Sequence, residues 1–135
     1  MKNQLNIRLS KNFTLAEFIK SKTASENYIS NQFELDFSVV QNIKDLTTHV
    51  LQPIRDVPGV MHITSGYRCE DLNKLVGGTQ NSQHLQGRAV DFMCNNRDLV
   101  IEVINYLSFD QFIIYDSFFH VSFDLARNRK EILIR

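Results

Sequence analysis

Residues 82–93 read SQHLQGRAVDFM and combine a polar loop with a strand. Over the last six of these residues, successive side chains point to opposite faces, so Val90 and Asp91 lie on different sides of the strand. Residues 119–123, FHVSF, alternate in the same way and place His120 on the polar face. If the apolar faces pack against helices, Asp91 and His120 both lie on the open face of a sheet, where they can line a cleft.

The segments that precede this stretch are predicted to be mainly helical. From about Asp36 to Val57, apolar residues recur at three- and four-residue spacing, which indicates an amphipathic helix that kinks or ends near Pro53. Shorter helices are predicted where start and stop signals bracket an apolar pattern. These helices are one opened by a capping box of Thr14 and Glu17, one over 70–76 before Gly77-Gly78, and one from the cap Asn96 to about Leu107.

Short β-rich runs separated by polar turns dominate the last third of the chain. The predicted strands are 60–64, 88–93, 112–115, 119–123 and 131–134. Helices first and a cluster of strands later indicate the α+β class. We therefore predict a single domain over residues 1–135, in which helices pack on one face of a small antiparallel sheet.

The composition indicates a globular protein without an obvious charged partner. The chain has 135 residues, of which 43% are hydrophobic, and 15 Lys+Arg balance 15 Asp+Glu. A neutral chain lacks the net positive charge that favours nucleic-acid binding, so we expect no nucleic-acid partner. We also expect a monomer. No stretch has the length of a membrane span, and MKNQLNIRLSKNF at the start lacks the apolar core of a signal peptide. Cys69 and Cys94 do not make a disulfide framework.

A loop histidine, His84, joins the two residues of the open sheet face. His84, Asp91 and His120 offer two nitrogen donors and one oxygen donor, and three protein ligands plus water is the arrangement of catalytic zinc sites. The ordinary alternatives are a loop histidine, a polar histidine on a strand and a turn-forming aspartate.

The surrounding motifs resemble the zinc D-Ala-D-Ala carboxypeptidase family. That family shares a zinc-peptidase superfamily with the lysostaphin-type enzymes and the hedgehog domain. The motifs are Ser65-Gly66-Tyr67-Arg68, Asn73, Val76-Gly77-Gly78, Ser82-x-His84-x-x-Gly87-x-Ala89-x-Asp91 and His120-Val121-Ser122. The opening Phe13-Thr14-Leu15-x-Glu17-Phe18 and the segment Leu51-Gln52-Pro53-Ile54-Arg55 resemble the small single-domain branch found in bacteria and their phages.

The resemblance implies a role for each matching residue. His84, Asp91 and His120 correspond to the zinc ligands. Arg68 corresponds to the cation that binds a substrate carbonyl or carboxylate and the charge that develops on it, a role suited to an always-charged guanidinium. Ser82 would hold substrate or order the loop, and Gly87 would provide the turn that returns His84 towards Asp91.

One position departs from the family pattern. Members place a glutamate, the general base and acid, shortly before the last histidine, and Tyr115 occupies that position here. Asp116 is the nearest carboxylate, four residues before His120, and we predict that it serves as the base. The alternatives are Tyr115 as a hydrogen-bonding substitute, or a missing base.

The resemblance implies a zinc metallopeptidase, either carboxypeptidase or endopeptidase, that cleaves peptidoglycan stem peptides at the bacterial cell wall. A phage lysin or a virion-associated protein fits the small size. The bond cleaved stays open between D-Ala-D-Ala, L-Ala-D-Glu and a cross-bridge. The alternative function is a zinc-containing module that has lost catalysis and binds peptidoglycan or a protein.

Overall fold

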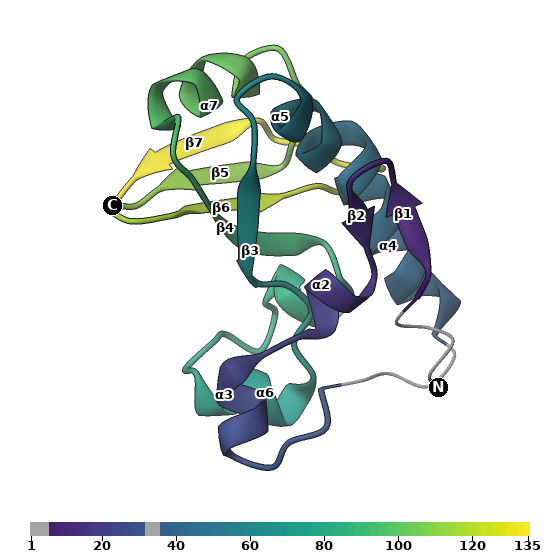
Figure 1. The fold of residues 1–135 in the computed structure, drawn as a ribbon. Coiled ribbons are helices and arrows are strands. Elements are labelled where there is room, and N and C mark those ends of the chain that lie inside the picture. The colour runs from purple at the N-terminus through teal and green to yellow at the C-terminus, as the bar shows by residue number, and fades with distance from the viewer. Residues whose placement is uncertain (1–5, 32–35) are drawn as a thin grey trace.

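The structure, a computed structural model, describes residues 6–31 and 36–135. We predict that the N-terminal residues 1–13 form no signal peptide, and residues 1–5 of this stretch lie outside the described residues. Figure 1 shows a sheet with helices beside it and a smaller part that carries α3 (Lys22–Glu26) and α6 (Glu70–Leu75) below it. No helix in the described ranges is long and apolar enough to cross a membrane.

The main sheet confirms the predicted α+β class and has one parallel pair. Its strand order is β3 (Met61–Ser65), β4 (Ala89–Cys94), β6 (Phe119–Ser122), β5 (Gln111–Ile114) and β7 (Glu131–Ile134). Neighbouring strands are antiparallel except β5 and β7, which pair in parallel. Because β4 and β5 already occupy both sides of β6, the last strand, β7, joins the sheet at its edge, beside β5. The predicted antiparallel sheet therefore gains a parallel edge strand.

The long predicted helix forms as one continuous body with an irregular turn. It comprises α4 (Phe37–Leu46), the π-helical turn η1 (Thr47–Leu51) and α5 (Gln52–Asp56). The side chain of Asp36 accepts the backbone N–H groups of Ser38 and Val39 and so caps the start. Pro53 lies at the start of α5, directly after the π-helical turn, and this irregular turn accommodates its missing N–H. The irregular turn just before it corresponds to the predicted kink.

The core lies between this helical body, α7 (Arg97–Ile104) and one face of the sheet. Its buried members include Ile43, Leu46, Val50, Ile104, Val90, Phe92, Phe119 and Val121. The strand residues in this group are those that the alternation assigned to the apolar face. Asn96 precedes α7 as expected, but its side chain makes no capping hydrogen bond to that helix, and the helix ends at Ile104 rather than near Leu107.

The N-terminal elements brace the loop that follows β3. A hairpin of β1 (Arg8–Ser10) and β2 (Phe13–Thr14), which the sequence pattern did not indicate, leads into α2 (Ala16–Ile19). Half of the predicted capping box forms, because the Glu17 carboxylate accepts the Thr14 N–H at 2.8 Å. The backbone of Phe18 approaches Gly66 so closely that a Cβ on Gly66 would lie 2.5 Å from the Phe18 carbonyl oxygen. Only glycine fits there, directly before Tyr67 and Arg68.

Candidate metal centre

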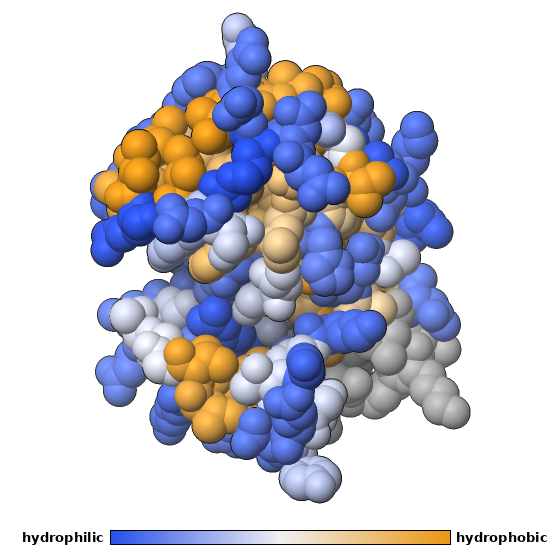
Figure 2. Space-filling model, turned by 60° about the vertical axis from the view of Figure 1, so that its left-hand side comes forward, coloured by the Kyte–Doolittle hydropathy of each residue, from blue (hydrophilic) through white to orange (hydrophobic). Residues whose placement is uncertain are grey.

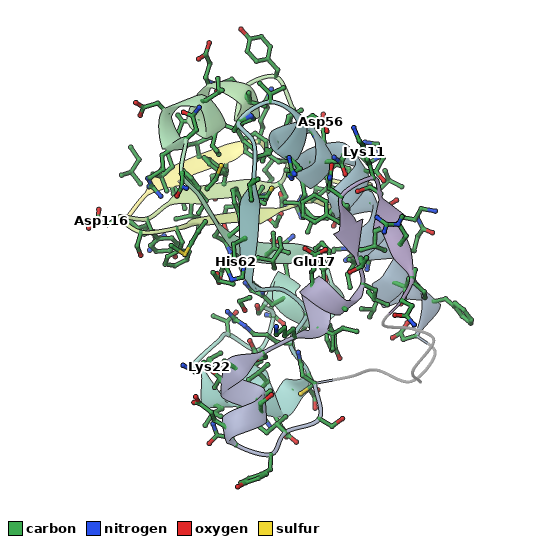
Figure 3. All side chains as sticks on the ribbon, in the orientation of Figure 1. Lys11, Glu17, Lys22, Asp56, His62 and Asp116 are labelled. Carbon is green, nitrogen blue, oxygen red and sulfur yellow. The ribbon has the colours of Figure 1, made fainter. Side chains whose placement is uncertain are left out.

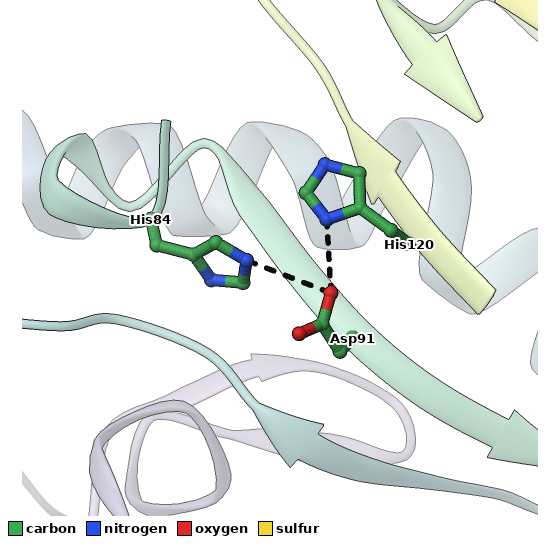
Figure 4. A group of neighbouring side chains, drawn as sticks. All are labelled: His84, Asp91 and His120. Atoms are coloured by element: carbon green, nitrogen blue, oxygen red, sulfur yellow. Dashed lines mark hydrogen bonds and ion pairs between the residues drawn. The ribbon is translucent and has the colours of Figure 1, made fainter. Parts of the chain in front are cut away.

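Three side chains from three different elements converge on the open face of the sheet (Figure 4). Asp91 on β4 and His120 on β6 are register partners, so their side chains leave the sheet side by side. His84 comes from the 3-10 helix η2 (Gln83–Gln86), which lies beside β4. One donor atom from each residue lies within 4.8 Å of the other two. The structure thus brings together the three predicted zinc ligands.

The donor geometry fits zinc. Asp91 Oδ1 lies 2.9 Å from His120 Nδ1 and 3.5 Å from His84 Nε2. Ligand bonds of about 2.0–2.1 Å in a tetrahedron put neighbouring donor atoms about 3.3 Å apart. His84 Nδ1 lies 2.8 Å from the carbonyl oxygen of Gly66, which can only accept, so Nδ1 donates and Nε2, on the side of Asp91, is the ring nitrogen available to a metal ion. One imidazole is therefore already held in an orientation that can bind a metal ion.

The Asp91 carboxylate is the negative centre of the group. Burial alone would raise the pKa of Asp91, but hydrogen bonds and charge from His120 and His84 hold the pKa well below its ordinary value. The other oxygen, Oδ2, lies 3.5 Å from Nη2 of Arg68. Burial lowers the pKa of Arg68, and the charge of Asp91 opposes that shift. Asp91 thus connects the histidines to the cation.

A set of polar side chains fixes Arg68. Its Nε donates to Ser65 Oγ at 3.2 Å and its Nη1 to Asn73 Oδ1 at 3.4 Å. The buried side chain of Asn31 holds the backbone on both sides of Arg68, because Nδ2 donates to the Tyr67 carbonyl at 2.8 Å and Oδ1 accepts the Cys69 N–H at 2.7 Å. The sequence reading missed Asn31, since a single asparagine in a loop carries no periodic signal.

Ser82 and Gly87 shape the turn that carries His84. Ser82 Oγ accepts the backbone N–H of His84 at 3.2 Å and caps η2. Gly87 follows η2 with φ of +73°, and a Cβ there would lie 2.8 Å from Ile43 Cγ1 and 2.9 Å from the Val39 carbonyl oxygen. The turn therefore packs directly against α4 and needs glycine for both conformation and space.

The ligands lie in a cleft of about 350 Å³, here called the metal cleft. The face in Figure 2 is hollowed between the part that contains the sheet and the part below it. The metal cleft is lined by Arg68, Thr79, Asn81, Ser82, Gln83, His84, Asp91, Gln111, Ile113, Tyr115, Phe118 and His120. Strand alternation could have found Ile113, which is the register partner of His120, whereas Thr79 and Asn81 lie in a loop without such a signal.

The turn between β5 and β6 separates the two candidates for a base. Asp116 is exposed and projects from the tip of this turn (Figure 3), and it is not among the residues that line the metal cleft. Tyr115 lines the cleft, with its ring stacked on Phe118 at 4.4 Å, and its carbonyl accepts Nη2 of Arg97 at 2.5 Å. Of the described residues that line the cleft, Asp91 is the only carboxylate. The structure therefore does not bring Asp116 together with the other predicted site residues.

Comparison with known proteins gives one family. The family model described as Peptidase M15 matches residues 11–122, a range that contains all of the residues discussed at this centre. No curated protein matches the chain.

Proposed function

The chain belongs to the peptidase M15 family, the zinc peptidases of the D-Ala-D-Ala carboxypeptidase type, and on this premise we propose that it hydrolyses a peptide bond in the stem peptides of peptidoglycan. The observation that carries the proposal is the convergence of His84, Asp91 and His120 beside Arg68 in one open cleft. The site of action is the bacterial cell wall, and a phage lysin is the specific form we favour.

The three converging residues would hold the zinc ion. Because they supply three ligands, a fourth position stays available, which is the arrangement of catalytic rather than structural zinc. When bound there, zinc would polarise the scissile carbonyl and lower the pKa of water. Gly66 and Ser82 prepare the set by orienting the ring and the backbone of His84.

Arg68 and Ser82 are the proposed substrate-binding residues. The Arg68 guanidinium lines the cleft next to Asp91 and can donate to a carbonyl oxygen, to a terminal carboxylate and to the negative charge that develops during attack. Its hydrogen bonds to Ser65 and Asn73 keep it in place before substrate arrives, which reduces the cost of ordering it. The Ser82 hydroxyl accepts from the backbone and can still donate its own hydrogen to a bound peptide.

The cleavage needs a group that takes a proton from the attacking water. We propose Asp116 for this role on its position in the sequence, and Tyr115 as the competing residue on its position in the cleft. Asp116 could act only if the β5–β6 turn brought its carboxylate from the exposed tip towards His120. Tyr115 needs no such movement, and its hydroxyl would act chiefly as a hydrogen-bond donor.

One observation favours a second function, a zinc-containing module that binds peptidoglycan without cleaving it. In the part of the chain that the structure describes, the cleft presents no carboxylate other than Asp91, which both histidines already engage. A carboxylate held in that way is a poor proton acceptor. A binding module would keep the ligands and Arg68 but release no product.

Digestion of purified peptidoglycan by the zinc-loaded protein tests the proposal. We expect new peptide fragments by mass spectrometry, their loss with a chelator, and their loss in His84→Ala. The masses identify the bond cleaved and separate carboxypeptidase from endopeptidase activity. Intact peptidoglycan together with measurable binding to it would establish the second function, and intact peptidoglycan without binding would exclude both.

Two variants then identify the base. If Asp116 is the base, Asp116→Ala abolishes cleavage at unchanged zinc content while Tyr115→Phe stays active. If Tyr115 acts, the two results are reversed. Asp56→Ala, an exposed aspartate on α5, is the matched control and should leave cleavage and zinc content unchanged.

A further inference from the structure

A second hollow adjoins the metal cleft, and here it is called the side pocket. It has a volume of about 320 Å³ and is lined by Asn81, Gln83, Asp110, Asp124, Arg127 and Arg129. Asn81 and Gln83 line both hollows, so the two are separated only by the width of these side chains. A peptide that left the metal cleft on this side would enter the side pocket.

The carboxylates of the side pocket are already engaged. Asp110 is buried, accepts Nε and Nη2 of Arg129 at 2.8 and 3.1 Å, and also accepts the side-chain amide of Gln83 at 2.9 Å. These hydrogen bonds hold the pKa of Asp110 below its ordinary value although burial works in the opposite direction. Asp124 accepts the Ala126 N–H at 3.0 Å and lies 3.9 Å from Arg88.

Arg127 is the cation that remains. Within residues 6–31 and 36–135, its side chain has no hydrogen bond or ion pair, although its backbone N–H donates to the backbone carbonyl of Asp124. The lining of the side pocket holds two arginines, Arg127 and Arg129, and two aspartates, Asp110 and Asp124, and of these four charged side chains Arg127 is the one without a partner in the described part of the chain. A guanidinium offers several donors in one plane and matches a carboxylate in shape and charge.

We propose that the side pocket is a subsite for a carboxylate of the bound peptide, with Arg127 as the group that recognises it. The proposal rests on the proposed function, because it assigns an acidic residue of the stem peptide to the part of the substrate next to the metal cleft. The α-carboxylate of a γ-linked D-glutamate is such a group. Arg129 serves as the fixed wall of the pocket because Asp110 already binds it.

Two synthetic stem peptides test the subsite. They are the pentapeptide with D-glutamate and the same pentapeptide with D-isoglutamine, which replaces the free carboxylate by an amide and changes nothing else. Calorimetric titration of the zinc-loaded protein at low temperature, where turnover is slow, measures binding separately from cleavage. We expect the acid to bind about 3- to 10-fold more tightly, a preference that weakens at high salt.

Arg127→Gln should remove this preference. The affinity for the D-glutamate peptide should fall to that for the D-isoglutamine peptide, whose own affinity should stay the same. Arg135→Gln changes an exposed arginine just beyond the other end of β7 and should keep the preference. Equal binding of both peptides by the wild type, or an equal loss for both in Arg127→Gln, would overturn the subsite and leave the proposed function intact. Binding of neither peptide by the wild type would overturn the proposed substrate class and the subsite with it.

Discussion

The two walls of the metal cleft differ in how firmly the fold holds them. On one wall, His84, Asp91 and Arg68 are tied to each other and to the backbone of Gly66 and the side chain of Ser65. On the other wall, Tyr115 and Phe118 flank a turn whose tip is exposed. The first wall keeps every residue of the family pattern, and the second departs from it. Metal binding is therefore the property that the structure supports most strongly, and the proton acceptor belongs to the wall that departs from the family pattern.

The largest expected effect tests the first wall. His84→Ala removes one of three ligands, and we expect zinc affinity to fall by about 10³-fold, with a loss of cleavage in parallel. His62→Ala is the matched control, because this exposed histidine lies on the neighbouring strand β3 and outside the ligand group (Figure 3). Metal content after dialysis against a weak chelator measures the effect. Full zinc retention in His84→Ala would refute the ligand assignment.

The next effect tests the second wall. Tyr115 lines the cleft where the family pattern has a glutamate, so Tyr115→Glu places a carboxylate inside the metal cleft. We expect the rate of peptide cleavage to rise by about 10²-fold or more if the wild type has no working base, as general bases typically contribute, and to change little if Asp116 already serves as the base. Zinc content should stay the same, and Tyr115→Gln controls for the loss of the aromatic ring. A rate that stays low in both wild type and Tyr115→Glu would show that the turn does not place residue 115 within reach of the water.

A smaller effect tests how the first wall is supported. Gly87→Ala introduces both a backbone strain and a contact of 2.8 Å with Ile43, whereas Gly77→Ala introduces only the strain, because Gly77 has φ of +76° and nothing within 4 Å of an added Cβ. We expect Gly77→Ala to lower the free energy of unfolding by about 1 kcal/mol and Gly87→Ala by about 2–4 kcal/mol. Urea unfolding of the metal-free proteins measures both. Equal losses would mean that the η2 turn is not packed against α4.

The same contrast between walls explains what the sequence could predict. Period-two alternation assigned Asp91 and His120 to one face, because both strands are buried on the other face and register follows burial. The resemblance of the surrounding motifs to the peptidase family then added His84 to the ligands and Arg68 to the predicted site. Alternation says nothing about Asn31 or Asn81, which act from loops, and it could not place Asp116, because the position of a residue in an exposed turn depends on the length and twist of the hairpin.

The parallel edge strand shows a second limit of sequence reading. Residues 131–134 look like any short strand, and their direction is decided by contacts far away in the chain. Arg129 binds the buried Asp110 through its side chain and its backbone N–H, and the Lys130 and Glu131 N–H groups donate to the carbonyls of Phe109 and Asp110. These contacts start β7 beside the beginning of β5, and the parallel register follows.

The smallest effect concerns Asp110. Its carboxylate accepts a hydrogen bond from Gln83, the residue before His84 on the first wall. Because hydrogen bonds to Arg129 and Gln83 outweigh burial, the folded pKa of Asp110 lies below the unfolded value of about 4. Its contribution to stability is then complete above the unfolded pKa and is lost as pH falls through the folded pKa. Asp110→Asn should lower the melting temperature by roughly 3–8 °C at pH 7 and by progressively less below pH 4. The matched change Asp116→Asn, in the exposed turn, should have little effect on the melting temperature at either pH. If the melting temperature of Asp110→Asn stayed below that of the wild type by the same amount down to pH 2, the charge of Asp110 would not stabilise the fold.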